Sequence, residues 1–210
     1  MKPFTKTILS NLFVGIMLCA VPAFSQQSNW WIFGDNASIN FNTNTVGTLP
    51  CTTVEGTASV SNSSGQLLFY TDGIKVYKSN GLVMPDATLS QSYVMSGTIT
   101  TAQTLIVQKS SSQYYVFTVA QQGAGKVKYS VVDMNQNSGT VISINTAMPD
   151  PSGTALNDCE KMTAIRHCNG VDYWVITHEK ANKVFKAYLI SSSGVGNPVI
   201  STTTNSSHTH

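Results

Sequence analysis

The chain has 210 residues, of which 10% are charged and 41% are hydrophobic, and its formal net charge at pH 7 is +2. Residues 1–25 contain two of the twelve lysines and arginines and none of the ten acids, so the rest of the chain is neutral. A neutral chain without a basic patch lacks the electrostatic footprint of a protein that binds nucleic acid or an anionic membrane surface. We therefore expect neither as a partner.

The first 25 residues have the pattern of a secretory signal peptide. Lys2 and Lys6 form a short positive region before the apolar, uncharged segment Ile8–Val21, and Ala23 and Ser25 are small residues at the positions that a signal peptidase reads before cleaving after Ser25. We expect an exported chain that begins at Gln26 and is secreted or held at the outer cell surface. The apolar segment is shorter than the ~20 residues that span a bilayer, so no transmembrane segment is expected after cleavage.

Three cysteines follow the predicted signal peptide: Cys51, Cys159 and Cys168. An odd number leaves at least one without a partner inside the chain, and the sequence does not fix their redox state. If most of the interval between Cys159 and Cys168 is one strand, their Cα atoms lie roughly 25 Å apart, beyond the reach of a disulfide. We interpret all three as small buried residues.

From residue 30 onward the sequence alternates between short β-prone runs and turn residues rich in Gly, Asn, Asp and Ser. A first hairpin is predicted from 30–33 and 39–41. The later predicted strands, in chain order, are 57–61, 67–71, 74–77 and a possible 82–84, then 100–108, 114–119, 127–133 and 140–144, and finally 162–167, 173–178, 184–190 and 199–201. No helix is predicted.

A repeated triplet groups these strands into units. Phe69-Tyr70-Thr71, Val116-Phe117-Thr118 and Val175-Ile176-Thr177 occur at offsets of 47 and 59 residues, close to the period of a propeller blade. The prediction is an all-β chain of antiparallel four-stranded blades. Because propellers close with four to eight blades, and residues 26–210 supply only about three and a half, we expect one partial or truncated β-propeller domain. A β-sandwich, which needs no ring closure, is the alternative.

Several segments resemble a large group of exported Bacteroidota surface proteins. They are 30–34, 55–59 leading into 65–73, and 161–179, and the similarity extends over most of 29–201. The group has a propeller-like N-terminal region and a C-terminal domain associated with gliding motility and type IX secretion. That domain does not occur in these 210 residues. The resemblance implies a cell-surface location and names no activity, since the group is mostly uncharacterised.

A small set of polar residues could support catalysis. His178 and Glu179 are adjacent near the end of a predicted strand, and a histidine beside carboxylates can act as a general base. Hydrolysis of glycans or peptides could instead use the loop carboxylates Glu55, Asp72 and Glu160. A strand-end histidine with a hydrogen-bonded partner explains His178 without catalysis, and we favour that interpretation.

Two further patterns, a calcium-loop pattern and a set of tryptophans, suggest ligand binding. Asp133, Asn135 and Asn137 have the alternating oxygen ligands of a calcium loop, but Gly139 falls one position late and Ile144 stands where a bidentate Glu is required, so a hairpin is favoured.

Trp30, Trp31 and Trp174 could stack on sugar rings if they are exposed, although large aromatics in short strands more often pack between sheets. No G-x-S-x-G, H-E-x-x-H, Walker or dinucleotide-binding motif occurs, so no cofactor is expected. We predict a non-catalytic exported module for adhesion or a structural role, binding an extracellular glycan or protein and able to self-associate through an open sheet edge. A secreted hydrolase that uses His178 or the loop carboxylates is the alternative.

Overall fold

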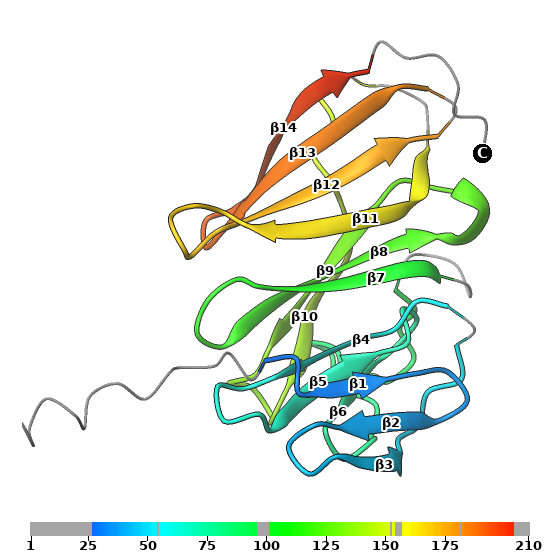
Figure 1. The fold of residues 1–210 in the computed structure, drawn as a ribbon, viewed down its shortest axis with the longest axis vertical. Coiled ribbons are helices and arrows are strands. Elements are labelled where there is room, and N and C mark those ends of the chain that lie inside the picture. Colours follow the sequence, from blue (N-terminus) through cyan, green and yellow to red (C-terminus); the bar gives the residue numbers. More distant parts are fainter. Residues whose placement is uncertain are drawn as a thin grey trace, which may run out of the picture.

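The structure, a computed structural model, describes residues 27–203 except 54, 96–100, 152, 154–156 and 181. The predicted signal peptide and its cleavage site lie outside these residues. The described chain is all-β, with four antiparallel sheets and a single turn of 3₁₀ helix at Gln121–Gly123 (Figure 1). Among these residues no helix has both the length and the apolar character required to cross a bilayer.

Each sheet is built from strands that are consecutive in the chain and joined as antiparallel hairpins. The first sheet contains β1 (Trp30–Ile32), β2 (Ala37–Asn40) and β3 (Thr45–Thr48), and the second contains β4 (Ala58–Ser61), β5 (Leu67–Thr71) and β6 (Val76–Lys78). The third contains β7 (Thr101–Gln108), β8 (Gln113–Ala120), β9 (Lys128–Asp133) and β10 (Thr140–Ala147). The fourth contains β11 (Asp158–Arg166), β12 (Tyr173–Glu179), β13 (Val184–Ser191) and β14 (Gly194–Thr202).

The four sheets form an open stack, with the first sheet at one end and the fourth at the other (Figure 1). The leading strands β1, β4, β7 and β11 lie next to one another along the stack. The described strands form no closed barrel. The prediction of an all-β chain made of successive small antiparallel sheets is confirmed, and the arrangement is also compatible with the sandwich-like alternative.

A separate apolar cluster fills each of the three spaces between neighbouring sheets. The strand β8 illustrates how one strand fills the spaces on both of its sides, because successive strand residues point to opposite faces of the sheet. Its Tyr114 and Val116 pack towards the second sheet, whereas Tyr115 and Phe117 pack towards the fourth. All four side chains are buried, because β8 has a neighbouring sheet on each of its two sides.

The repeated triplets occupy equivalent places in the stack. They lie in β5, β8 and β12, which are the second strands of their sheets. Their threonines, Thr71, Thr118 and Thr177, are all buried where each strand approaches its end. The repeat therefore marks a structural unit, as the sequence indicated.

The strand prediction was wrong in several details. The second sheet has three strands, because the segment predicted at 82–84 contributes only an isolated bridge between Tyr77 and Val83. The strand β3 was missed, since all four of its residues are exposed and carry no apolar alternation. The last strand is much longer than 199–201, because a tight turn after Ser191 lets β14 begin already at Gly194.

Candidate functional site

The outer face of the fourth sheet is apolar. Antiparallel partners lie on the same face of a sheet, and the pairs Ile165–Trp174 and Trp174–Leu189 place one apolar row across β11, β12 and β13. A second row joins Ile176 to Val199 through Ala187 of β13. With Phe185 at the end of β13, these residues form what we call the last-sheet face. Its members are Ile165, Trp174, Ile176, Phe185, Leu189 and Val199.

The last-sheet face is uncovered by any described residue. Phe185 is 38% exposed, Ile165 54% and Val199 57%, while Trp174, Ile176 and Leu189 are half-buried. The alternate residues of β12, such as Val175, point inward to the cluster shared with the third sheet. Trp174 and Ile176 are therefore not buried between two sheets, because no described sheet packs on their side.

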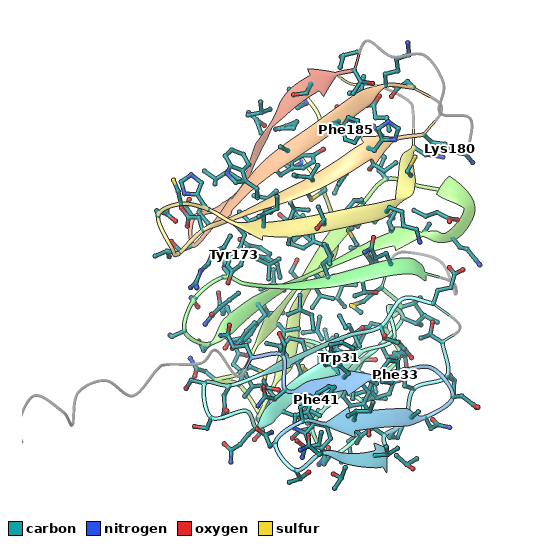
Figure 2. The ribbon with its side chains drawn as sticks, viewed as in Figure 1. Trp31, Phe33, Phe41, Tyr173, Lys180 and Phe185 are labelled. Carbon is teal, nitrogen blue, oxygen red and sulfur yellow. The ribbon has the colours of Figure 1, made fainter. Side chains whose placement is uncertain are left out.

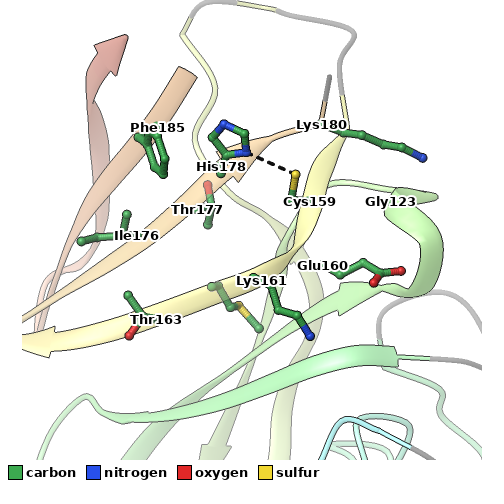
Figure 3. A pocket seen from close by; sticks show the side chains of 11 residues that line it. Gly123, Cys159, Glu160, Lys161, Thr163, Ile176, Thr177, His178, Lys180 and Phe185 are labelled. Carbon is green, nitrogen blue, oxygen red and sulfur yellow. Dashed lines mark hydrogen bonds between the residues drawn. The ribbon is translucent and has the colours of Figure 1, made fainter. Parts of the chain in front are cut away.

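A hollow of about 710 Å³ opens at the end of this face where β12 finishes (Figure 3). Its walls come from β11, β12 and β13, with Gly123 from the turn after β8. Ile176, Phe185 and Met162 give it an apolar lining. Its polar lining residues are Cys159, Glu160, Lys161, Thr163, Thr177, His178 and Lys180.

The sequence-predicted His178 lies in this hollow and has two close neighbours. Its Nδ1 is 3.2 Å from the Sγ of Cys159 on β11, and its ring centroid is 4.5 Å from that of Phe185, the residue opposite it on β13. These contacts hold the imidazole between a thiol and an aromatic ring. They match the favoured interpretation of a strand-end histidine with a hydrogen-bonded partner.

The electrostatics of this pair oppose a nucleophilic role for the thiol. Burial raises the pKa of Cys159, and the neighbouring Asp158 carboxylate adds to the increase, while Lys180 acts in the opposite direction. A reactive cysteine requires a lowered thiol pKa, because the thiolate is the nucleophile. Cys159 therefore stays a protonated thiol at neutral pH, and the pair does not provide an activated nucleophile.

Glu179 follows His178 but points to the other side of β12, into the space between the third and fourth sheets. Its Oε1 is 2.5 Å from the Nζ of Lys186, and both side chains are 2% exposed. Its Oε2 accepts a hydrogen bond from the Nδ2 of Asn182 at 2.5 Å. Glu179 is thus part of a buried ion pair that joins β12 to β13, and it does not face the hollow.

Two further carboxylates complete this buried charge cluster. Asp150 lies 3.7 Å from Lys186 and 2.5 Å from Lys126. Asp158, directly opposite Glu179 in the sheet, accepts a hydrogen bond from the backbone N–H of Val127 through Oδ2. Burial raises the pKa of Asp158, and the hydrogen bond from Val127 and the ammonium groups of Lys186 and Lys126 only partly offset that increase. The cluster links the third sheet to the fourth.

Two of the other predicted catalytic carboxylates, Glu55 and Asp72, are far from His178 in the stack. Asp72 is buried at the end of β5, where Oδ1 accepts hydrogen bonds from the backbone N–H groups of Ile74 and Lys75 and Oδ2 accepts one from the Tyr77 hydroxyl. Glu55 is exposed and precedes β4. Both belong to the second sheet, whereas Glu160 and His178 line the hollow on the fourth. The structure therefore brings Glu160 near His178 but does not bring the four residues together.

The three tryptophans have different surroundings. Trp30 is half-buried and packs against the cluster between the first and second sheets. Trp31, on the opposite face of β1, is 52% exposed and meets Phe33 and Phe41 edge to face (Figure 2). Trp174 lies on the last-sheet face. Two of the three are thus available for contact with a ligand.

The predicted calcium-loop residues form the β9–β10 hairpin. Asp133 accepts hydrogen bonds from the backbone N–H of Asn135 through Oδ1 and from the side chain of Gln113 through Oδ2. The Nδ2 of Asn135 donates to the Ser112 hydroxyl, and Asn137 has a positive φ of 51°. These oxygens and amides already stabilise a turn. Within the described ranges no group of three His, Cys, Asp or Glu side chains is arranged to hold a metal ion.

The cysteines differ from the sequence interpretation. Only Cys51 is buried, whereas Cys159 is partly exposed and Cys168 is exposed, so the expectation that all three are buried was wrong. All three are free thiols, and Cys159 and Cys168 lie at opposite ends of β11. The strand geometry that argued against a disulfide between them is confirmed.

Sequence reasoning missed the two interactions that define this region, the Cys159–His178 contact and the Glu179–Lys186 ion pair. The first was hidden because β11 starts at Asp158, earlier than the predicted 162, and contains a bulge before Met162. The second could have been found from the register of the β12–β13 hairpin. Thr177 pairs with Lys186, and Glu179 lies two residues further along β12 on the same face as Thr177. Comparison of the chain with protein-family models, curated proteins and solved structures found no match.

Proposed function

We propose that the chain is an exported, non-catalytic module that binds an extracellular partner through the last-sheet face and its hollow. The observation that carries the proposal is that six apolar side chains share one sheet face with no described residue covering it. Contiguous exposed apolar surface of this kind marks interaction sites. The signal-peptide pattern and the resemblance to Bacteroidota surface proteins support a location outside the cell or on its outer surface.

A protein fits this surface better than a glycan does. The last-sheet face is broad and apolar, whereas recognition of a sugar requires several polar groups that converge on its hydroxyls. Of the polar side chains that line the hollow, His178 and Cys159 are engaged with each other. The neutral chain argues against nucleic acid as the partner.

Two observations favour binding over hydrolysis. Glu55 and Asp72 lie in the second sheet, away from His178, so they cannot act with it on one bond. The raised pKa of the Cys159 thiol removes the most evident nucleophile beside His178. An enzyme would instead require a pocket where acid, base and nucleophile converge.

Binding of the dye bis-ANS, whose fluorescence rises on apolar surface, tests the proposal. We expect Phe185→Ser and Ile176→Ser each to lower the fluorescence increase of the purified chain by about twofold, because each removes part of the exposed apolar surface. Leu82→Ser is the matched control, since Leu82 is 63% exposed but lies outside this face.

Equal dye binding by the Phe185 and Leu82 variants would overturn the proposed surface. Turnover of chromogenic glycosides or casein that disappears in His178→Ala would overturn the non-catalytic assignment and favour the hydrolase.

A further inference from the structure

The charge cluster between the third and fourth sheets contains more carboxyl groups than ammonium groups. The carboxyl groups are those of Asp150, Asp158 and Glu179, and the ammonium groups are those of Lys126 and Lys186. The residues between 27 and 203 that lie outside the described part of the chain include none with a charge, so they add no balancing group. If every carboxyl group of the cluster were ionised, one negative charge would be left without a counter-charge in this space.

Asp158 differs from the other two carboxyl groups in its contacts. Glu179 and Asp150 each lie 2.5 Å from a lysine ammonium. Asp158 is 3% exposed, and its Oδ2 accepts the backbone N–H of Val127. Its Oδ1 is buried and has no hydrogen-bond partner among the described residues. Because a buried oxygen without a donor disfavours the charged form, Asp158 is the carboxyl group that should carry a proton.

The groups around Asp158 favour the protonated form. Burial raises the pKa of the Asp158 carboxyl and the Glu179 carboxylate adds to the increase, while Val127 and the two lysines only partly offset it. The titratable groups near Asp158 come from each element around it. They are Glu179 on β12, Lys186 and Tyr188 on β13, Cys159 on β11 itself, Lys126 before β9, Asp150 after β10, and Tyr115 and Tyr129 in the apolar part of the same space.

We propose that the folded chain holds a proton on Asp158, and that loss of this proton weakens the contact between the third and fourth sheets. The proton removes the excess charge and turns Oδ1 into a donor. The buried hydroxyl of Thr177, on the same face of the fourth sheet, also has no partner among the described residues and supplies an acceptor. The inference does not depend on the partner of the last-sheet face.

Loss of the proton would place two carboxylates side by side. Asp158 and Glu179 are directly opposite each other in the β11–β12 pair, and like charges in such a pair are destabilising. Only Glu179 has an ammonium at 2.5 Å to compensate it. The fold therefore contains a pH-sensitive latch, in which one buried proton helps to hold the fourth sheet on the third.

The sign of the pH dependence follows from the direction of the shift. The pKa of Asp158 in the folded chain lies above its ordinary value of 3.8. The stability that this carboxyl contributes is therefore fully present below its ordinary pKa, and it is lost as the pH rises through the folded-state pKa. Higher pH releases the latch.

Asp158→Asn tests the latch, because an amide has nearly the same shape as the protonated carboxyl and cannot ionise. Urea denaturation of the full chain and of this variant is compared from about pH 4.5 to about pH 8. The stability of Asp158→Asn relative to the unmodified chain should increase as the pH rises, and the variant should be the more stable protein at the upper end. A relative stability that is constant or decreases with pH would overturn the proposal.

Asp133→Asn is the matched control. Asp133 is also buried, at 7% exposed, but hydrogen bonds from the side chain of Gln113 and the backbone of Asn135 lower its pKa. Its carboxyl is already ionised across this pH range, so the stability of Asp133→Asn relative to the unmodified chain should change far less with pH. An equal increase for both variants would overturn the assignment to Asp158.

Two measurements on the unmodified chain remain informative if Asp158→Asn fails to fold. The side-chain carboxyl carbon of Asp158, followed by NMR, should titrate with a midpoint above 3.8, and a midpoint at or below that value would overturn the proposal. Hydrogen exchange shows where the fold weakens. The Asp158 N–H donates to the Gly125 carbonyl in the β8–β9 loop, whereas the Met84 N–H donates to the Val76 carbonyl beside the second sheet. Rising pH should lower the protection factor of Asp158 more than that of Met84, and equal losses would overturn the placement of the latch between the third and fourth sheets.

Discussion

Replacing Lys186 with methionine is expected to lower the free energy of unfolding by about 3–5 kcal/mol at pH 7. Lys186 is 2% exposed and forms a 2.5 Å ion pair with Glu179, which is equally buried. The methionine side chain preserves most of the volume but leaves Glu179 without its ammonium partner. An unpaired buried carboxylate is costly because no water compensates its charge. The midpoint of urea denaturation measures the loss.

The loss should depend on pH in a defined direction. Burial already raises the pKa of Asp158 above its ordinary value of 3.8, so protonation of this carboxyl favours the folded chain. Without Lys186 nearby, the ionised forms of Asp158 and Glu179 become less favourable still. The difference in stability between the parent chain and Lys186→Met should therefore be largest near neutral pH and shrink as the pH falls towards about 4, where carboxyl groups protonate.

Two further variants make this result interpretable. Glu179→Gln combined with Lys186→Met removes both charges and should recover at least about half of the lost stability, because no unpaired charge remains between them. Lys161→Met, at an exposed lysine of β11, should change stability by no more than about 0.5 kcal/mol. If Lys186→Met were as stable as Lys161→Met, the ion pair would not be buried between the sheets.

Phe117→Ala is expected to have an effect of similar size, about 3–5 kcal/mol, for a different reason. Phe117 is fully buried on β8 in the cluster between the third and fourth sheets, with its ring centroid 5.9 Å from that of Tyr115 and 6.0 Å from that of Tyr129. Truncation would leave a cavity between two sheets whose backbones cannot easily move together.

Phe185→Ala provides the comparison, because it removes the same side chain from an open sheet face. Phe185 is 38% exposed, so its truncation should cost about 1 kcal/mol or less. Chemical denaturation of both variants gives the two values. Equal losses would mean that the last-sheet face is covered in the folded protein, or that the space between the third and fourth sheets is not packed.

The order of the strands could be predicted from the sequence wherever apolar runs are separated by turn residues. The runs around Phe69, Phe117 and Val175 supplied both the β-strand signal and the repeat, because each lies on the second strand of a sheet that packs on a neighbour. β3 was not readable, since the exposed segment 45–48 forms its strand by hydrogen bonding to β2 and buries no side chain. Hydrophobic pattern carries no information about such a strand.

The candidate site was only partly predictable, because it depends on contacts between strands. The sequence identified His178 as a strand-end histidine with a hydrogen-bonded partner. It could not place Cys159, since the bulge in β11 changes which residues face the hollow. It also assigned Glu179 to the same group as His178, although adjacent strand residues point to opposite faces and Glu179 pairs with a lysine in the interior.

The face-to-face stacking of small antiparallel sheets is tested most directly by nuclear Overhauser effects between Phe69 and Tyr114. These rings belong to the second and third sheets, and their centroids are 5.3 Å apart in an edge-to-face contact. The stacked arrangement predicts strong cross-peaks between their ring protons in the purified chain. Assigned rings that show no cross-peak would mean that these two sheets do not pack on one another, which would contradict the stack.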